Sequence, residues 1–284
     1  MDFFARRKLY RDALLSFIRA ESDLYLLTDM PGNIGDHLIC AGTRELLVSG
    51  NIRFKCIPVG KVANTARKSS TLLIPGSGAF DQRWHEWLPD TVLAASNNFR
   101  RVIILPSSYD VSVPIVVKSL SQRNVFPFAR EVKSYLSIKH LNHAALCFDC
   151  ATFFNFNEAG TTDLRVDEAK APLLVLREDA GSLLGTQGYA PNPVINQDIS
   201  LTTSCLDDWI AKIRNVTTVV TDRLHVGVAA VLLGKQLVYI DPYGEKLSTY
   251  FKYTFRESFK DRITRCSLSW LMENKYILPV KENA

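Results

Sequence analysis

Short runs of β-branched and apolar residues alternate with segments of helical periodicity along most of the chain. Residues 2–20 place apolar side chains at helical spacing against a basic face, which predicts an amphipathic helix. Buried strands and further helices are predicted after it: strands at 23–28, 52–58, 71–74, 101–105, 124–128 and 144–148, and helices at 38–48 and 129–138. Strands that alternate with helices in this way predict a parallel sheet with helices on both faces.

The periodic pattern stops at residues 155–170, which is typical of a linker, and then starts again. The second half is predicted to contain strands at 172–176, 217–221 and 236–240, an extended segment at 198–203, helices at 206–213 and after 221, and a last helix that includes Trp270 and Leu271. We therefore predict an α/β protein of two Rossmann-like lobes, residues 1–165 and 166–284, that face a cleft.

The segment 217–234 has the strongest pattern of polar residues at a strand end. A predicted strand ends at Thr221, and Asp222, Arg223 and His225 follow before an apolar helix that Gly234 ends. In parallel sheets this corner lies at the carboxyl edge, where ligands bind, and the first helical turn favours an anion. Arg223 could bind a phosphate or carboxylate and His225 could transfer a proton. A purely structural reading stays open, with Asp222 as an N-cap, Arg223 solvated and His225 packed.

A second corner with glycine and polar residues follows the first predicted strand. Residues 29–37 are predicted to form a loop in which glycine, such as Gly35, lets the backbone approach a ligand closely, and Asn33 is a candidate binding residue beside it. Asp36 could orient or deprotonate a hydroxyl group, or it could cap the helix at 38–48. Loops around Gly76, Gly78 and Ser108 are predicted to lie at the same kind of edge. The corner carries neither a GxGxxG fingerprint nor a Walker lysine.

Composition narrows the class of protein. A chain of 284 residues with 47% apolar and 22% charged residues can bury a large core and is not disordered. The formal charge of +5 suits an anionic substrate or an acidic membrane surface, and no block of Lys and Arg indicates nucleic-acid binding. The six cysteines are scattered, which predicts buried free thiols and no metal site. The sequence shows neither a signal peptide nor a membrane span, so we expect a cytoplasmic protein.

Eight short motifs, in order along the chain, carry a resemblance to a known family. They are Asn33-Ile34-Gly35-Asp36, Pro75-Gly76-Ser77-Gly78, Leu105-Pro106-Ser107-Ser108, Ala129-Arg130-Glu131, Asp149-Cys150-Ala151, Leu176-Arg177-Glu178-Asp179, Thr221-Asp222-Arg223-Leu224-His225 and Asp241-Pro242-Tyr243-Gly244-Glu245-Lys246. This ordered set resembles the polysaccharide pyruvyl transferase family. Two motifs depart from it: Gly76-Ser77-Gly78 replaces the commoner glycine triplet, and Pro106 lacks the glutamine that often follows.

The resemblance implies a fold similar to two-lobed GT-B glycosyltransferases and transfer of pyruvate from phosphoenolpyruvate to two sugar hydroxyls as a ketal. By position, Arg223, Leu224 and His225 resemble the family's donor-binding residues, and Arg177 resembles a second donor-binding arginine. Phosphoenolpyruvate is then the donor substrate, and no metal or cofactor is expected.

We expect His225 to transfer the proton. Lys246 could reach the donor phosphate, and the alternative that it is a solvated loop lysine stays open. The expected acceptor is a sugar of a bacterial-type exopolysaccharide or cell-surface glycan, carried on a lipid-linked oligosaccharide or glycan. The first helix could contact the inner membrane peripherally. Two alternatives stay open: a GT-B-type glycosyltransferase that uses a nucleotide sugar, and a non-catalytic partner protein that kept the fold.

Overall fold

The computed structural model describes residues 1–19, 25–29, 31–65, 67–80, 87–141, 143–157, 171–179, 182–242 and 245–280. The chain divides into two compact units. The first contains Met1–Gly32 and Asp36–Phe154, and the second contains Asn33–Gly35 and Asn155–Ala284. Most of the predicted linker and the predicted lobe boundary at 165/166 lie outside the described residues.

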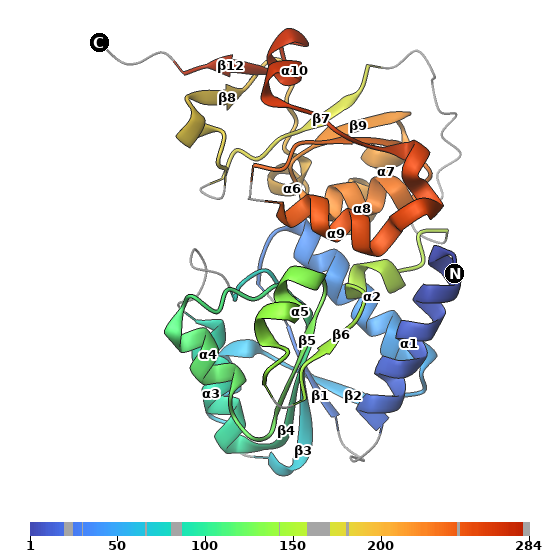
Figure 1. Ribbon diagram of the computed structural model, residues 1–284. Helices are drawn as coiled ribbons and strands as arrows, with labels where there is room; N and C mark the ends of the chain where they lie inside the picture. The colour runs from blue at the N-terminus through green and yellow to red at the C-terminus, as the bar shows by residue number, and fades with distance from the viewer. Residues whose placement is uncertain are drawn as a thin grey trace. The chain divides into compact units, whose positions relative to one another are not determined.

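A six-stranded parallel sheet forms the centre of the first unit, which confirms the predicted class of sheet (Figure 1). Its strands, in spatial order, are β2 (Phe54–Ile57), β1 (Tyr25–Thr28), β3 (Arg67–Ile74), β4 (Phe99–Ser107), β5 (Val125–Ala129) and β6 (Ala145–Leu146). On one face lie α1 (Phe3–Arg19) and α2 (Ile34–Ser49), and on the other lie α3 (Leu88–Asn98) and α4 (Pro114–Leu120) (Figure 1). The short helices η1 (Val59–Lys61), α5 (Val132–Ile138) and η2 (Cys150–Phe153) complete the unit.

The core of the first unit explains why its central strands are continuous apolar runs. Leu72, Leu73 and Ile74 of β3 are all 0% exposed, so this strand is covered on both faces. The same holds for residues 102–105 of β4. A parallel sheet with helices on both sides requires this pattern in place of strict alternation.

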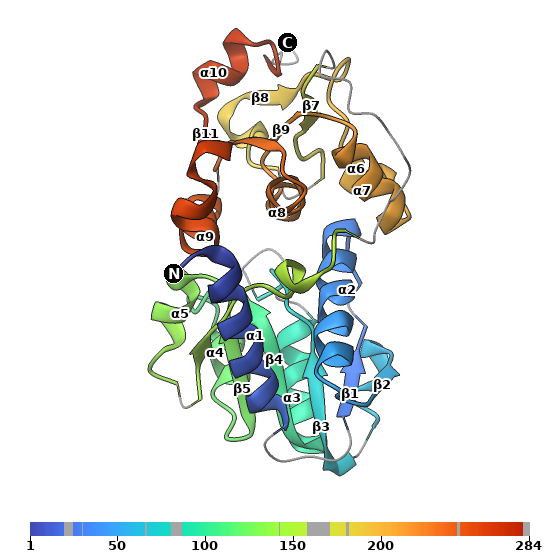
Figure 2. The ribbon, with the colours of Figure 1, turned by 90° about the vertical axis from the view of Figure 1, so that its right-hand side faces the viewer.

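The second unit contains a four-stranded parallel sheet and a separate two-stranded ribbon. The sheet has the order β11 (Ile263–Arg265), β10 (Gln236–Tyr239), β9 (Thr218–Thr221) and β7 (Leu173–Val175). Helix α8 (Leu224–Leu232) lies between α7 (Leu206–Arg214) and α9 (Lys246–Phe255) (Figure 2). The antiparallel strands β8 (Tyr189–Pro191) and β12 (Ile277–Pro279) form the ribbon. Short helices complete the unit: η3 (Gly185–Gln187), α6 (Ile199–Thr202), η4 (Arg256–Arg262) and α10 (Leu268–Glu273).

Two predicted segments have a different local structure. The prediction of an extended segment at 198–203 is wrong, because residues Ile199–Thr202 form the single turn α6. The predicted loop at 29–37 is also wrong in its second half, because α2 begins at Ile34 and includes Gly35 and Asp36. The Asn33 side chain accepts a hydrogen bond of 2.8 Å from the Gly35 N–H, which is the bond of an N-capping residue. Asp36 therefore does not cap this helix.

The first helix and the cysteines also differ in part from expectation. In α1, Phe4 and Leu9 are 63% and 56% exposed, whereas Arg6 is buried with its guanidinium 4.8 Å from the ring centre of Phe148.

All six cysteines are free. Buried thiols are confirmed for Cys147 and Cys150 but not for the exposed Cys56 and Cys205. None of the helices in the described ranges has the length and apolar character that a bilayer span requires.

Candidate functional site

The corner between β9 and α8 has the structure that its sequence predicts. Val219 to Thr221 are buried in the strand, α8 begins at Leu224, and Gly234 adopts a φ of 76° just after the helix. The Thr221 hydroxyl donates to the Val175 carbonyl oxygen at 2.7 Å and accepts from the Arg223 N–H at 2.9 Å. These two bonds tie the corner to the neighbouring strand β7, and Arg223 takes the N-cap position of α8.

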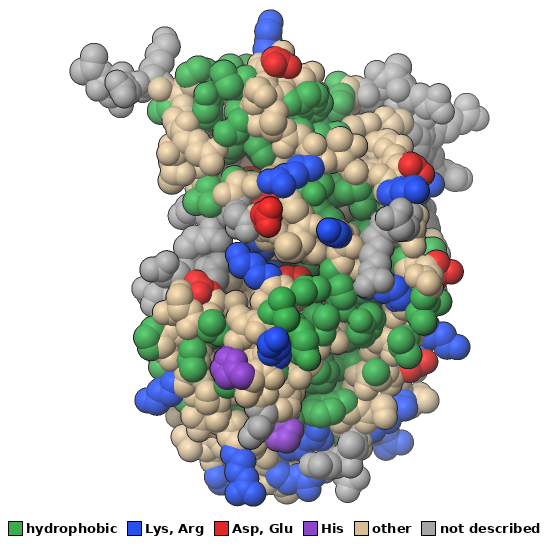
Figure 3. All heavy atoms as spheres, viewed as in Figure 1, with side chains coloured by type: hydrophobic (Ala, Val, Ile, Leu, Met, Phe, Trp, Pro, Cys, Tyr) green, Lys and Arg blue, Asp and Glu red, His purple; other side chains and the backbone are tan. Residues whose placement is uncertain are grey.

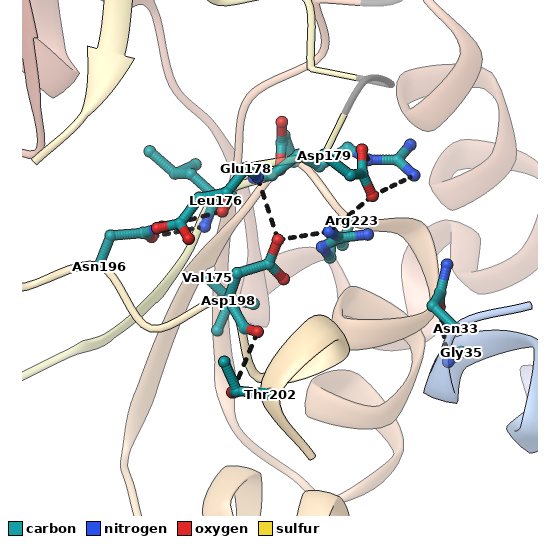
Figure 4. Close-up of polar contacts among 12 residues, drawn as sticks. Asn33, Gly35, Val175, Leu176, Glu178, Asp179, Asn196, Asp198, Thr202 and Arg223 are labelled. Carbon is teal, nitrogen blue, oxygen red and sulfur yellow. Dashed lines mark hydrogen bonds and ion pairs between the residues drawn. The ribbon is translucent and has the colours of Figure 1, made fainter. Parts of the chain in front are cut away.

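Arg223 is buried and ion-paired, with a side chain 5% exposed. Its Nη2 lies 2.9 Å from Oδ2 of Asp179 and also contacts Oδ2 of Asp198 (Figure 4). Asp198 Oδ2 accepts a further bond of 3.0 Å from the Glu178 N–H. The reading of Arg223 as a solvated first-turn residue is therefore wrong.

Strand register brings Arg177 to the same place. Val175 of β7 pairs with Thr221 of β9, so Arg177 and Arg223 each lie two residues beyond a paired position at the carboxyl ends of parallel strands. Arg177 donates from Nε to Asp179 Oδ1 at 3.0 Å and from Nη2 to Oδ2 at 3.2 Å. One carboxylate thus bridges two guanidinium groups.

The charges around Asp179 and Asp222 move their pKa values in opposite directions. Burial alone would raise the pKa of Asp179, but Arg177 and Arg223 outweigh it, and the pKa lies below its ordinary value. Asp222 is 1% exposed, and its burial raises its pKa to about 6. The hydrogen bond from the Arg177 N–H and the charges of the two arginines act in the opposite direction and lower the pKa, but by less than burial raises it. That bond, to Asp222 Oδ1, measures 2.9 Å. Asp222 is not the N-cap of α8, contrary to one of the readings from sequence.

Leu224 and His225 lie half-buried in the first turn of α8. A Cβ added to Gly35 would lie 3.0 Å from Nδ1 and 3.1 Å from Cβ of His225, so the histidine packs against the bare backbone of this glycine. Asn33 and Gly35 belong to the same unit as α8. Residues that the sequence placed at two separate corners therefore meet at His225.

Lys246 is half-buried at the start of α9, which follows β10, the neighbour of β9 in the sheet. Lys246 therefore follows the carboxyl end of an adjacent strand, and its contact with the donor phosphate stays a prediction. Tyr243 and Gly244 of the same motif lie outside the described residues.

The remaining predicted residues belong to the first unit, where a second polar cluster follows β4 and β5. Ser108 is buried, accepts from Arg130 Nε at 2.8 Å and donates to Glu131 Oε2 at 3.1 Å. Arg130 Nη1 also lies 3.1 Å from Asp149 Oδ2. This cluster ties together the ends of β4, β5 and β6.

The two glycines of the first unit differ in their surroundings. A Cβ at Gly76 would strike the carbonyl oxygen of Pro106, so this glycine lets the ends of β3 and β4 approach each other. Gly78 is half-buried just beyond it. Asp36 lies in the first turn of α2, where a Cβ on Gly32 would meet its carboxylate. Roles for these residues in acceptor binding stay predictions.

Sequence reasoning missed Asp179 and Asp198, the two partners of Arg223. Asp179 lies in the same motif as Arg177, so a charged pair two residues apart was a local signal. Asp198 had no such signal, because its segment has an extended pattern in the sequence and the partners of its carboxylate, Glu178 and Arg223, are distant along the chain. Within the described residues, no group of three or more His, Cys, Asp or Glu side chains is arranged to hold a metal ion.

The two parallel sheets, with helices packed on them and polar clusters after their strands, define an α/β protein. A family model described as polysaccharide pyruvyl transferase matches residues 33–243, which include every motif from Asn33 to Asp222, Arg223 and His225. The chain belongs to the polysaccharide pyruvyl transferase family, as its motifs predicted.

A solved structure shows the same fold. It is that of a functionally uncharacterised protein, KP1_0663, from Klebsiella pneumoniae subsp. pneumoniae NTUH-K2044, with a TM-score of 0.73 and 21% identity over 92% of this chain and 98% of that one. At this identity the likeness concerns the fold alone. A search of curated proteins found no significant match.

Proposed function

We propose that this protein transfers pyruvate from phosphoenolpyruvate to two hydroxyl groups of a sugar and forms a cyclic ketal. Membership of the family supports a transferase of this type. The observation that carries the proposal is the convergence of Arg177 and Arg223 on a single carboxylate at the first turn of α8. Phosphoenolpyruvate carries both a carboxylate and a phosphate, and guanidinium forks and a helix N-terminus bind such groups.

The proposed chemistry needs one proton delivered to carbon and one site for the departing phosphate. In the proposal His225 gives a proton to the methylene carbon while a sugar hydroxyl attacks the neighbouring carbon, because an imidazole can give and accept protons near neutral pH. Asp36 accepts the proton of that hydroxyl. A second hydroxyl then displaces phosphate and closes the ring, and its proton leaves with the phosphate. Lys246 interacts with the donor phosphate. These steps consume no redox equivalent and require no metal.

The acceptor in this proposal is a sugar on a lipid-linked oligosaccharide or glycan of an exopolysaccharide or cell-surface polymer. Its candidate contacts in this proposal, in a fold similar to GT-B glycosyltransferases, are Gly76, Gly78 and Ser108 of the first unit and Asn33 and Gly35, which belong to the second. Peripheral contact with the inner membrane from the cytoplasmic side is supported by exposed apolar side chains. Phe4 and Leu9 project from the basic helix α1, and apolar side chains gather over α5, where Val132 and Leu136 are exposed (Figure 3).

Thermal unfolding with added ligands tests the donor. A saturating ligand that binds only the folded protein raises the melting temperature, so phosphoenolpyruvate should do so and a nucleotide sugar should not. Arg223→Ala should lose about 2–5 kcal/mol of donor binding by calorimetry, because it removes a charged and buried contact. Arg265→Ala, at an exposed arginine of β11, is the matched control. Equal donor affinity in Arg223→Ala and the parent would refute the donor site, and stabilisation by nucleotide sugars alone would favour a glycosyltransferase.

Turnover of His225→Gln tests the proton transfer. Glutamine can still hydrogen-bond but cannot carry a proton, so donor affinity should persist while phosphate release falls by about 10²- to 10⁴-fold. Phosphate release near the parental rate, with saturating donor and acceptor, would mean that His225 only binds.

A further inference from the structure

The two carboxylates that hold Arg223 differ in how firmly they are fixed. The side chain of Asp198 is 0% exposed, whereas that of Asp179 is 21% exposed. Both accept from the same atom, Nη2 of Arg223 (Figure 4). Burial restricts the movement of one partner, and the other lies where solvent and solutes reach it.

Asp198 is held from several directions. Its Oδ2 accepts from the Glu178 N–H at 3.0 Å in addition to Arg223, and its backbone carbonyl accepts from the Thr202 hydroxyl at 3.2 Å (Figure 4). Removing a buried charge from such a pair leaves the partner guanidinium unpaired inside the protein, at a high cost. Asp198 therefore orients Arg223 whether or not a ligand is bound.

Asp179 has the position that an anionic ligand would have. Arg177 contacts both of its oxygens, at 3.0 and 3.2 Å, and Arg223 contacts Oδ2 at 2.9 Å. Two guanidinium groups around one carboxylate form the geometry with which arginines bind carboxylate and phosphate ligands. Within the described part of the chain, the buried Nε of Arg223 has no hydrogen-bond partner, so one donor of this arginine remains for a further acceptor.

We propose that Asp179 is an internal competitor of the anionic donor: its carboxylate lies between Arg177 and Arg223 when no donor is bound and gives way to the carboxylate or phosphate of the donor. Asp198 stays in place and is the positioning residue for Arg223. This inference rests on the proposed function, because it takes phosphoenolpyruvate as the anion that competes with Asp179.

The two aspartates are therefore expected to respond to the same substitution in opposite directions. Asp179→Asn keeps the size of the side chain but removes the competing charge, so phosphoenolpyruvate should bind about three- to tenfold more tightly, a modest effect because a partly exposed ion pair is weak. Asp198→Asn should bind phosphoenolpyruvate at least about tenfold more weakly, since Arg223 loses its buried partner. Asp208→Asn, at an exposed residue of α7, makes the same change in net charge and should leave affinity unchanged.

Calorimetric titration of phosphoenolpyruvate and of inorganic phosphate into the parent and these variants separates the outcomes, with thermal unfolding as the check on folding. Asp179→Ala provides a second removal of the charge, so that one poorly folded variant does not decide the result. Tighter binding in the Asp179 variants and weaker binding in Asp198→Asn support the inference.

Two results would overturn it, and they differ. If the parent binds phosphoenolpyruvate through Arg223 but folded Asp179 variants bind as the parent does or more weakly, Asp179 is a permanent support of the arginines. The inference then fails while the proposed function stands. If the parent does not bind phosphoenolpyruvate, or binds it equally well after Arg223→Ala, the proposed function fails and the inference fails with it.

Discussion

Replacing Asp222 with asparagine will make the stability of the protein less dependent on pH. Asp222 is 1% exposed, and its Oδ1 accepts from the Arg177 N–H at 2.9 Å. Burial disfavours its charged form and raises its pKa from the ordinary 3.8 to about 6. Asparagine has nearly the same shape and can keep the bond to the Arg177 N–H through its own carbonyl oxygen.

The sign and size of the effect follow from this raised pKa. The folded protein binds the Asp222 proton more tightly than the unfolded chain does, so the stability from that proton is present below the ordinary pKa and is lost as the pH rises through about 6. A rise of about two pKa units corresponds to about 3 kcal/mol, of which about 1–2 kcal/mol accrues between pH 5 and pH 8. The parent loses this stability at high pH, whereas Asp222→Asn has no ionising group at this position and does not.

Urea unfolding of parent and variant at pH 5 and pH 8 measures the effect. The difference in free energy of unfolding, variant minus parent, should increase by about 1–2 kcal/mol in favour of the variant between these two values of pH. Any bond that the asparagine amide gains or loses shifts both measurements equally. Asp208→Asn, at an exposed carboxylate, is the control and should give a difference that does not change with pH. A difference for Asp222→Asn as flat as that of the control, or one that falls toward pH 8, would refute the reasoning.

Three further substitutions test other parts of the structure. Asp179→Asn should lower the melting temperature at pH 7 and should lose this effect in acid. The pKa of Asp179 is lowered, so its ion pairs stabilise the protein above the ordinary pKa and are lost as the pH falls. Equal effects at neutral and acidic pH would contradict this. Gly35→Ala should lower turnover more than donor affinity and should cost about 1–3 kcal/mol of stability in urea unfolding, because the added Cβ would lie 3.0 Å from Nδ1 of His225. A fully active variant would show that the close contact does not matter. Asp149→Ala should lower the free energy of unfolding by about 3–5 kcal/mol in the same assay, because it takes this partner from the buried guanidinium of Arg130. A loss below about 1 kcal/mol, as for a surface pair, would contradict the prediction.

Local patterns in the sequence were enough to predict the strands and helices around the β9–α8 corner. A β-branched run gave strand β9, the apolar run after Arg223 gave α8, and Gly234 ended it with a positive φ that glycine adopts at little cost. The continuous apolar runs of β3 and β4 likewise predicted buried parallel strands. These features depend on neighbours in sequence, so they are visible without a fold. The start of α2 at Ile34 also depends on a neighbour in sequence, because Asn33 caps the helix. The glycines of this motif nevertheless led to the prediction of a loop there.

Tertiary structure decided which polar residues meet. Arg177 and Arg223 share one carboxylate because Val175 pairs with Thr221 in the sheet, a register that no local pattern specifies. Asp198 reaches Arg223 from a turn of helix that the sequence predicted as extended. Burial was decided in the same way. Arg223 is an ion-paired interior residue whose side chain is 5% exposed, whereas its place in the sequence suited a solvated first turn equally well. The sequence thus determined the elements and the candidate chemistry, and the packing of distant strands determined the charges that each candidate residue faces.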